Sequence, residues 1–126
     1  MSCAFGEIIF GWPWDQDMEL YLRELTDEER EAIGIYDFDS ESQISTDDAQ
    51  ALGFETFYSA SGSEVCGYLG VKLDDINVYT PTLMSEFNME PTPEQEKLVE
   101  EKRAQLPPKI AEQLGKPRVW IVWGDT

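Results

Sequence analysis

The chain has 126 residues, of which 41% are apolar, and this is enough for one hydrophobic core. It carries 26 Asp and Glu residues against 9 Lys and Arg residues and no His, which gives a formal net charge of -17. A charge of this sign repels nucleic-acid phosphates and anionic lipid surfaces, so neither is expected as a direct partner. The 12% aromatic content argues against a disordered acidic chain.

Compartment is predicted from what the sequence lacks. Residues 1–7 contain neither the basic region nor the cleavage site of a signal peptide, and no apolar run approaches the roughly 20 residues of a membrane-spanning helix. We therefore expect a cytoplasmic protein. Cys3 and Cys66 form no CxxC pair, which argues against a zinc site and predicts reduced thiols.

The first predicted elements are one strand and two helices. Residues 3–12 are β-branched and aromatic and end at Pro13, which is typical of a strand. Four apolar residues then recur with helical spacing, namely Met18, Tyr21, Leu22 and Leu25. Thr26 and Glu29 form a capping box, which predicts a second short helix ending at Gly34.

The middle of the chain is acidic and is followed by a predicted hairpin. Residues 35–52 are polar, with a short helix expected to begin near Ser45 or Thr46. Residues 54–58 and 65–73 have the composition of strands and are separated by a Gly- and Ser-containing turn. We expect these two strands to pair.

The last third contains a loop, a helix and a final strand. Residues 74–91 are too apolar for a free linker, so we expect them to pack over the sheet. Thr92 and Gln95 form a capping box that begins a helix, which breaks at two prolines and resumes over residues 109–114. Residues 118–123 are apolar on both faces, which predicts an interior strand.

The predicted element order indicates the fold class. Strand, helices, strand, strand, helices and strand follow one another, which is the order of a ferredoxin-like, or split βαβ, domain. We therefore predict a single α+β domain over residues 1–126, with a four-stranded antiparallel sheet and helices on one face.

The charge is unevenly distributed along the sequence. Residues 15–75 hold 17 acidic and 3 basic residues, whereas residues 91–126 hold 6 of each. Crowded carboxylates repel one another and destabilise the folded state. We interpret this unbalanced charge as a means of binding a partner with a basic surface. We predict an acidic module that binds a basic surface of a nucleic-acid-handling protein. In composition it resembles the small phage or mobile-element inhibitors that mimic nucleic acid.

The predicted partner surface combines carboxylates with two aromatic anchors. The carboxylates supply electrostatic steering and the aromatic rings supply desolvated contacts. The candidate residues are Trp14, Glu28, Glu31, Asp37, Phe38, Asp39, Glu41, Asp47 and Asp48. An ordinary solvated acidic face on a small cytosolic ligand-binding or housekeeping domain is the alternative.

A second alternative is a calcium module, because residues 37–48 resemble a calcium loop of the EF-hand kind. The ligands would be Asp37, Asp39, Glu41, Gln43 and Asp48. The loop departs from that pattern, since Ser42 replaces the turn Gly, Glu41 is long for its position and Asp48 replaces a Glu. An acidic loop leading into a helix capped by Ser45 or Thr46 explains the same residues.

Enzymatic chemistry is not expected. The chain has no His, so the commonest acid and base near neutral pH is missing. No cofactor is predicted. Four aromatic residues, Tyr58, Tyr68, Trp120 and Trp123, either line a ligand pocket on the sheet or belong to the core.

Overall fold

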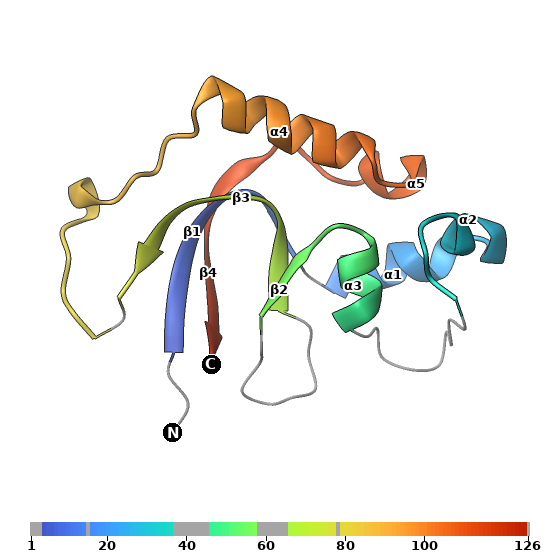
Figure 1. Ribbon diagram of the computed structural model, residues 1–126, viewed down its shortest axis with the longest axis horizontal. Coiled ribbons are helices and arrows are strands. Elements are labelled where there is room, and N and C mark those ends of the chain that lie inside the picture. The colour runs from blue at the N-terminus through green and yellow to red at the C-terminus, as the bar shows by residue number, and fades with distance from the viewer. Residues whose placement is uncertain (1–3, 15, 37–45, 58–65, 78, 126) are drawn as a thin grey trace.

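The computed structural model describes residues 4–14, 16–36, 46–57, 66–77 and 79–125. The elements follow one another as predicted, strand, helices, strand, strand, helices and strand, and form a small α+β domain (Figure 1). In chain order they are β1 (Ala4–Pro13), α1 (Gln16–Glu24), α2 (Asp27–Ala32), α3 (Thr46–Ala51), β2 (Glu55–Phe57), β3 (Cys66–Ile76), η1 (Met84–Glu86), α4 (Pro93–Ala104), α5 (Pro108–Ala111) and β4 (Arg118–Asp125).

The four strands form one sheet in the order β2-β3-β1-β4, and every neighbouring pair is antiparallel. The predicted four-stranded antiparallel sheet is therefore confirmed. β2 pairs with β3 from Glu55 opposite Tyr68 to Phe57 opposite Cys66, which confirms the pairing expected for the hairpin.

Two glycines face each other across the β1–β3 pair and let the strands approach closely. Gly11 lies opposite Gly70, and both have φ of +145°. A Cβ atom on Gly70 would lie 2.1 Å from the Phe10 carbonyl oxygen, and one on Gly11 would lie 2.0 Å from the Leu69 carbonyl oxygen. Only glycine fits at both positions. In Figure 1, α4 crosses above the curved strands that contain this pair.

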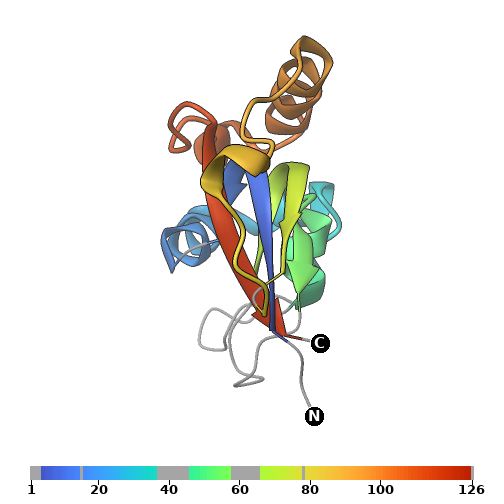
Figure 2. The ribbon, with the colours of Figure 1, turned by 90° about the vertical axis from the view of Figure 1, so that its left-hand side faces the viewer.

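The main core joins the helices to one face of the sheet. Trp12 and Leu69 lie opposite each other in β1 and β3, and the Trp12 Nε1 donates a hydrogen bond to the Gly115 carbonyl oxygen at 2.9 Å. The helices and their connections contribute Leu22, Leu25, Ile35, Ala49, Leu52, Phe54, Val99, Leu106, Ile110 and Leu114. Figure 2 shows α4 and α5 at the top of this arrangement, with the strands running downward from them.

The sequence signals at helix ends are confirmed. The Thr26 hydroxyl accepts a hydrogen bond from the Glu29 amide at 3.1 Å, and the Thr92 hydroxyl accepts one from the Gln95 amide at 3.2 Å. In return, the side-chain oxygen of Glu29 or Gln95, at the third helical position, accepts a hydrogen bond from the Thr amide. These contacts satisfy amides that the first helical turn leaves without partners. The short helix expected near Ser45 or Thr46 is α3.

The prediction of an interior final strand is wrong. Residues 118–123 belong to β4, which lies at the end of the sheet with β1 beside it. Both faces of β4 are apolar, but β4 has a neighbouring strand on one side alone among the described residues. Val119 and Ile121 are exposed, as are Trp120 and Trp123.

The segment over residues 74–91 also differs from the expectation. β3 includes its first residues up to Ile76, and the apolar side chains of Tyr79, Leu83 and Met84 are exposed, not packed on the sheet. Phe87 and Met89 are half-buried, and the Asn88 amide between them donates a hydrogen bond to the Asp74 carboxylate at 2.9 Å. Among the described residues, none of the helices has the length and apolarity that a bilayer span requires.

Candidate acidic interface

The predicted carboxylates on α2 and α3 are largely exposed. Glu28, Glu31 and Asp47 face solvent, and Asp48 is half-buried. Acidic residues near a helix N-terminus are stabilised by its dipole, which explains why Glu28 and Asp47 are compatible with these short helices. We call these four residues the acidic surface. Among the described side chains, Glu28, Glu31 and Asp47 form no ion pair.

The basic residue nearest in sequence does not neutralise this surface, because it is buried. Arg30 is 9% exposed, and its Nη1 donates hydrogen bonds to the carbonyl oxygens of Leu22 and Leu25 at 3.3 and 2.5 Å. Its Nη2 contacts the Asp27 carboxylate. Arg30 thus holds the end of α1 to α2 and contributes little positive charge to the surface.

Two further cations bind backbone carbonyl groups. The Lys102 Nζ donates to the Gly70 carbonyl oxygen at 2.6 Å, which ties α4 to β3. The Arg103 Nη2 donates to the carbonyl oxygens of Ala111 and Leu114 at 3.0 and 2.9 Å, and its guanidinium lies 5.6 Å from the centre of the Trp12 ring. Both side chains therefore stabilise the fold instead of pairing with carboxylates.

Two other cations pair with carboxylates outside the acidic surface. Lys109 Nζ lies 3.0 Å from the Glu29 carboxylate, and Lys72 Nζ lies 3.2 Å from the Asp75 carboxylate. The hydrogen bond from the Thr26 amide, followed by the one from Lys109, lowers the pKa of Glu29. Glu29 is thus an ionised structural contact that joins α2 to α5.

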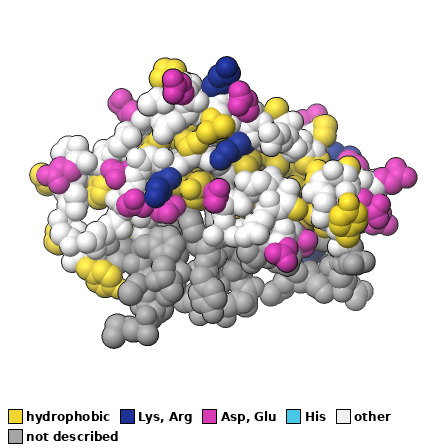
Figure 3. All heavy atoms as spheres, in the orientation of Figure 1, with side chains coloured by type: hydrophobic (Ala, Val, Ile, Leu, Met, Phe, Trp, Pro, Cys, Tyr) yellow, Lys and Arg dark blue, Asp and Glu magenta, His cyan; other side chains and the backbone are white. Residues whose placement is uncertain are grey.

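Carboxylates also lie outside α2 and α3. Figure 3 shows acidic side chains over α2 at the right-hand end, over α3 below the centre and over α4 along the top. On α4, basic residues share the helix with the acidic ones, which gives a surface of mixed sign. α3 has no basic residue, and the single basic residue of α2 is the buried Arg30. Lys109 of α5 brings an exposed positive charge to Glu29 of α2, but the described ion pairs do not include Glu28, Glu31 or Asp47.

Trp14 is the remaining predicted partner residue that the structure describes. Trp14 is half-buried, and its ring packs edge-on against Phe54 with the centroids 5.0 Å apart, so part of the proposed anchor belongs to the core. Its role in binding a partner stays a prediction. The predicted site residues Asp37, Phe38, Asp39, Glu41 and Gln43 lie outside the described residues, and the calcium loop likewise stays a prediction. Within the described ranges, no three His, Cys, Asp or Glu residues are grouped to hold a metal.

The structure also groups ionisable residues that the sequence analysis did not single out. Glu7 on β1 neighbours Tyr68, Lys72 and Asp75 of β3 and Glu55 of β2. Burial raises the pKa of Glu7, whose Oε2 is buried with no hydrogen-bond partner. Burial, followed by the charge of Glu7, raises the pKa of Tyr68 to about 12. The sequence did contain a signal for the burial of Glu7. Side chains alternate between the two faces of a strand, so Glu7 lies on the same face of β1 as the apolar Ile9.

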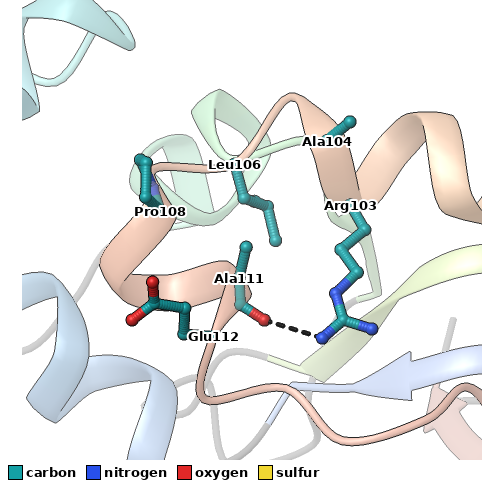
Figure 4. A pocket seen from close by; sticks show the side chains of 6 residues that line it. All are labelled: Arg103, Ala104, Leu106, Pro108, Ala111 and Glu112. Carbon is teal, nitrogen blue, oxygen red and sulfur yellow. Dashed lines mark hydrogen bonds between the residues drawn. The ribbon is translucent and has the colours of Figure 1, made fainter.

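An open hollow lies where α4 meets α5 (Figure 4). Its lining consists of Arg103, Ala104, Leu106, Pro108, Ala111 and Glu112. Figure 4 shows the Arg103 guanidinium directed at the Ala111 carbonyl oxygen. Because this donor group already bonds to the backbone, the hollow offers few free polar groups for a small ligand. Of the aromatic residues considered for a pocket, Tyr68, Trp120 and Trp123 do not line this hollow, and Tyr68 is buried with Ile9 and Val122. Tyr58 lies outside the described residues.

Comparisons of the chain with protein-family models, with curated proteins and with solved structures find no match. Among the described residues, the exposed carboxylates of Glu28, Glu31 and Asp47 form no ion pair, whereas the Arg103 side chain beside the hollow is bonded to backbone carbonyl groups.

Proposed function

We propose that this chain is a non-enzymatic, cytoplasmic protein-binding module that docks its acidic surface on a basic surface of a nucleic-acid-binding protein. In this role it mimics the charge of nucleic acid and acts as an inhibitor. Two observations support this proposal. Arg30, Lys102 and Arg103 donate hydrogen bonds to backbone carbonyl oxygens within the fold. The carboxylates of Glu28, Glu31 and Asp47 are exposed to solvent.

Electrostatics gives this surface a physical advantage in finding such a partner. A net charge of -17 creates a long-range field, and complementary fields raise association rates by orders of magnitude at low ionic strength. The same effect weakens when salt shortens the screening length from about 10 Å at 0.1 M to about 3 Å at 1 M. Binding of a basic partner is therefore expected to decrease steeply with salt.

We further propose that the strands are connected as in a ferredoxin-like domain. β3 lies between β1 and β2, and β1 lies between β3 and β4, so each helical crossover skips one strand. This strand order supports the proposed split βαβ arrangement. Arg30 ties α2 to the end of α1, and Lys109 ties it to α5, so the carboxylates of α2 are carried on a helix that is bonded to its neighbours.

The test compares two variants with the same change in net charge. The first, Glu28→Gln, Glu31→Gln and Asp47→Asn, neutralises the acidic surface. The matched control neutralises three carboxylates of α4, namely Glu94→Gln, Glu96→Gln and Glu100→Gln. Both variants and the parent chain are immobilised, and nucleic-acid-binding proteins are captured from lysate at about 0.05 M salt, with or without competing double-stranded DNA.

We expect the parent chain and the α4 variant to capture the same basic proteins, and we expect DNA or about 0.5 M salt to release them. The α2–α3 variant should lose most of this capture, because the interacting charges are gone. Equal capture by all three chains, or capture that neither salt nor DNA reduces, would contradict the proposal. Circular dichroism of each variant checks that the fold is intact.

A further inference from the structure

α2 carries Glu28 and Glu31 of the acidic surface, but it contributes no apolar side chain to the core. The helix has six residues, and Arg30 is its one buried residue. Figure 1 shows it next to α1 at the right-hand end of the molecule. A helix of this length is not stable by itself and usually depends on an apolar face packed against the protein. α2 is held instead by polar contacts and by the residues on either side of it.

Arg30 connects α2 to the chain before and after it. Its Nη1 donates hydrogen bonds to the carbonyl oxygens of Leu22 and Leu25, at the end of α1, where the last turn leaves carbonyl groups without helical partners. Its own carbonyl oxygen accepts a hydrogen bond from the Ile35 amide at 2.9 Å, and Ile35 is 2% exposed in the core. One residue thus links the helix to both of its neighbours.

A second contact of α2, with α5, is more exposed to water. Lys109 pairs with Glu29 at 3.0 Å, but the Lys109 side chain is 54% exposed. Exposed ion pairs contribute little to stability, because water and salt screen both groups. Hydrogen bonds from a buried guanidinium are stronger, because the charge acts in surroundings of low dielectric constant. Arg30 is therefore the main polar anchor of α2.

The direction of the Arg30 side chain also sets the direction of the two carboxylates. Successive residues of an α-helix are about 100° apart around the helix axis. In the same sense of rotation, Glu31 lies about 100° and Glu28 about 160° from Arg30. When Arg30 points into the fold, both carboxylates are turned outward on one side of the helix, and both are exposed. A rotation of α2 would therefore move both of them together.

We propose that Arg30 is a positioning residue of the acidic surface, which holds Glu28 and Glu31 in the arrangement that a folded basic surface recognises. The inference rests on the function proposed above and adds a requirement for order to the requirement for charge. Carboxylates that are fixed before binding lose little conformational freedom when a partner arrives, so the ordering cost is lower. The partner is accordingly a folded protein whose basic groups have fixed positions.

Charge alone predicts the opposite effect when Arg30 is removed. The chain has a net charge of -17, and loss of one positive charge makes it more negative still. A stronger negative field should attract a basic partner more strongly. If Arg30 positions the carboxylates, the same substitution should weaken binding. The sign of the change therefore separates positioning from net charge.

The test compares Arg30→Met with the matched control Arg103→Met. Both substitutions remove one positive charge and hydrogen bonds to backbone carbonyl groups, but Arg103 joins α4 to the α5 region. The first probe is the set of basic proteins that DNA releases from the immobilised parent chain. The second is poly-lysine, a flexible polycation whose charges adapt to any arrangement of carboxylates. Amide hydrogen exchange over residues 26–33 reports the order of α2 without a partner.

We expect Arg30→Met to speed exchange over residues 26–33 by about tenfold or more, because charged hydrogen bonds are lost. Its capture of the basic proteins should decrease by about threefold or more, whereas its binding of poly-lysine should be unchanged or stronger. Arg103→Met should match the parent chain in all three measurements. Arg30→Lys keeps the net charge but has a single donor group, so it should lie between Arg30→Met and the parent chain. It replaces Arg30→Met if circular dichroism shows that variant to be unfolded.

Three results would overturn the inference. They are unchanged exchange over residues 26–33 in Arg30→Met, capture by Arg30→Met that equals or exceeds that of the parent chain, and an equal loss of capture in Arg103→Met. The last result would mean that capture follows overall stability and not the position of α2. If the parent chain itself captures no basic protein that DNA releases, the proposed function is wrong and the inference falls with it.

Discussion

Arg103 provides a quantitative test of the idea that cations in this chain stabilise the backbone. It donates two good hydrogen bonds, to the Ala111 and Leu114 carbonyl oxygens at 3.0 and 2.9 Å, and its contact with the Gly115 carbonyl oxygen is longer, at 3.5 Å. A hydrogen bond from a charged donor contributes about 1.5 to 3 kcal/mol to stability. The Trp12 ring adds about 0.5 to 1 kcal/mol.

These contributions do not add fully, because the guanidinium is half-exposed and its contacts share one side chain. We expect Arg103→Met, which keeps the aliphatic stem, to lower the free energy of unfolding by about 3 kcal/mol. Arg103→Lys retains one point-like donor and should lose about half as much. Urea denaturation followed by tryptophan fluorescence measures both values.

The control for Arg103 is Lys97→Met on the same helix. Lys97 is exposed, and its loss should change the free energy of unfolding by less than about 0.5 kcal/mol. A change below about 1 kcal/mol for Arg103→Met would refute the reasoning. The charge of Arg103 would then be no more important to the fold than that of any exposed cation.

Two further predictions concern the sheet. Gly70→Ala should lower the free energy of unfolding by more than about 3 kcal/mol, because the new Cβ would lie 2.1 Å from the Phe10 carbonyl oxygen at a φ of +145°. The control is Gly115→Ala, which has open space around its new Cβ and should leave the free energy of unfolding nearly unchanged in the same urea denaturation assay. Glu7→Gln should raise stability at pH 7, because the folded state holds the Glu7 proton to a higher pH than the unfolded chain does and loses stability as pH rises through that raised pKa. The gain should vanish below the ordinary pKa of 4.5, and a gain that is constant with pH would be inconsistent with this cause.

Local signals in the sequence predicted the elements well, because their physical causes are local. The capping boxes at Thr26 and Thr92 each involve residues three apart, and both form as expected. Runs of β-branched, aromatic and other apolar residues predicted all four strands. These features depend on a few neighbouring residues, so one sequence is enough to identify them.

The position of β4 could not be predicted in the same way. An apolar pattern on both faces is the same for a strand buried between two others and for an edge strand that carries an exposed apolar surface. Which of the two applies depends on the strand order, and that order is set by contacts between distant parts of the chain. The exposed Trp123 therefore appeared in the sequence as a core residue.

The candidate site was predictable in its composition but not in its context. Counting charges identified the excess of carboxylates, and the structure places Glu28, Glu31 and Asp47 on exposed helices as expected. The sequence could not show that Arg30 is buried against carbonyl groups of α1. Nor could it show that Glu7 is partly buried, because both facts depend on packing between elements.

The two edges of the sheet differ in length and in the side chains that they expose. β2 has three residues, whereas β4 has eight and exposes Val119, Ile121 and Trp123. A strand of three residues offers few main-chain hydrogen bonds to another chain, and a longer apolar edge offers more. If unfolded or crowded chains aggregate, we therefore expect the first contacts at β4 and not at β2.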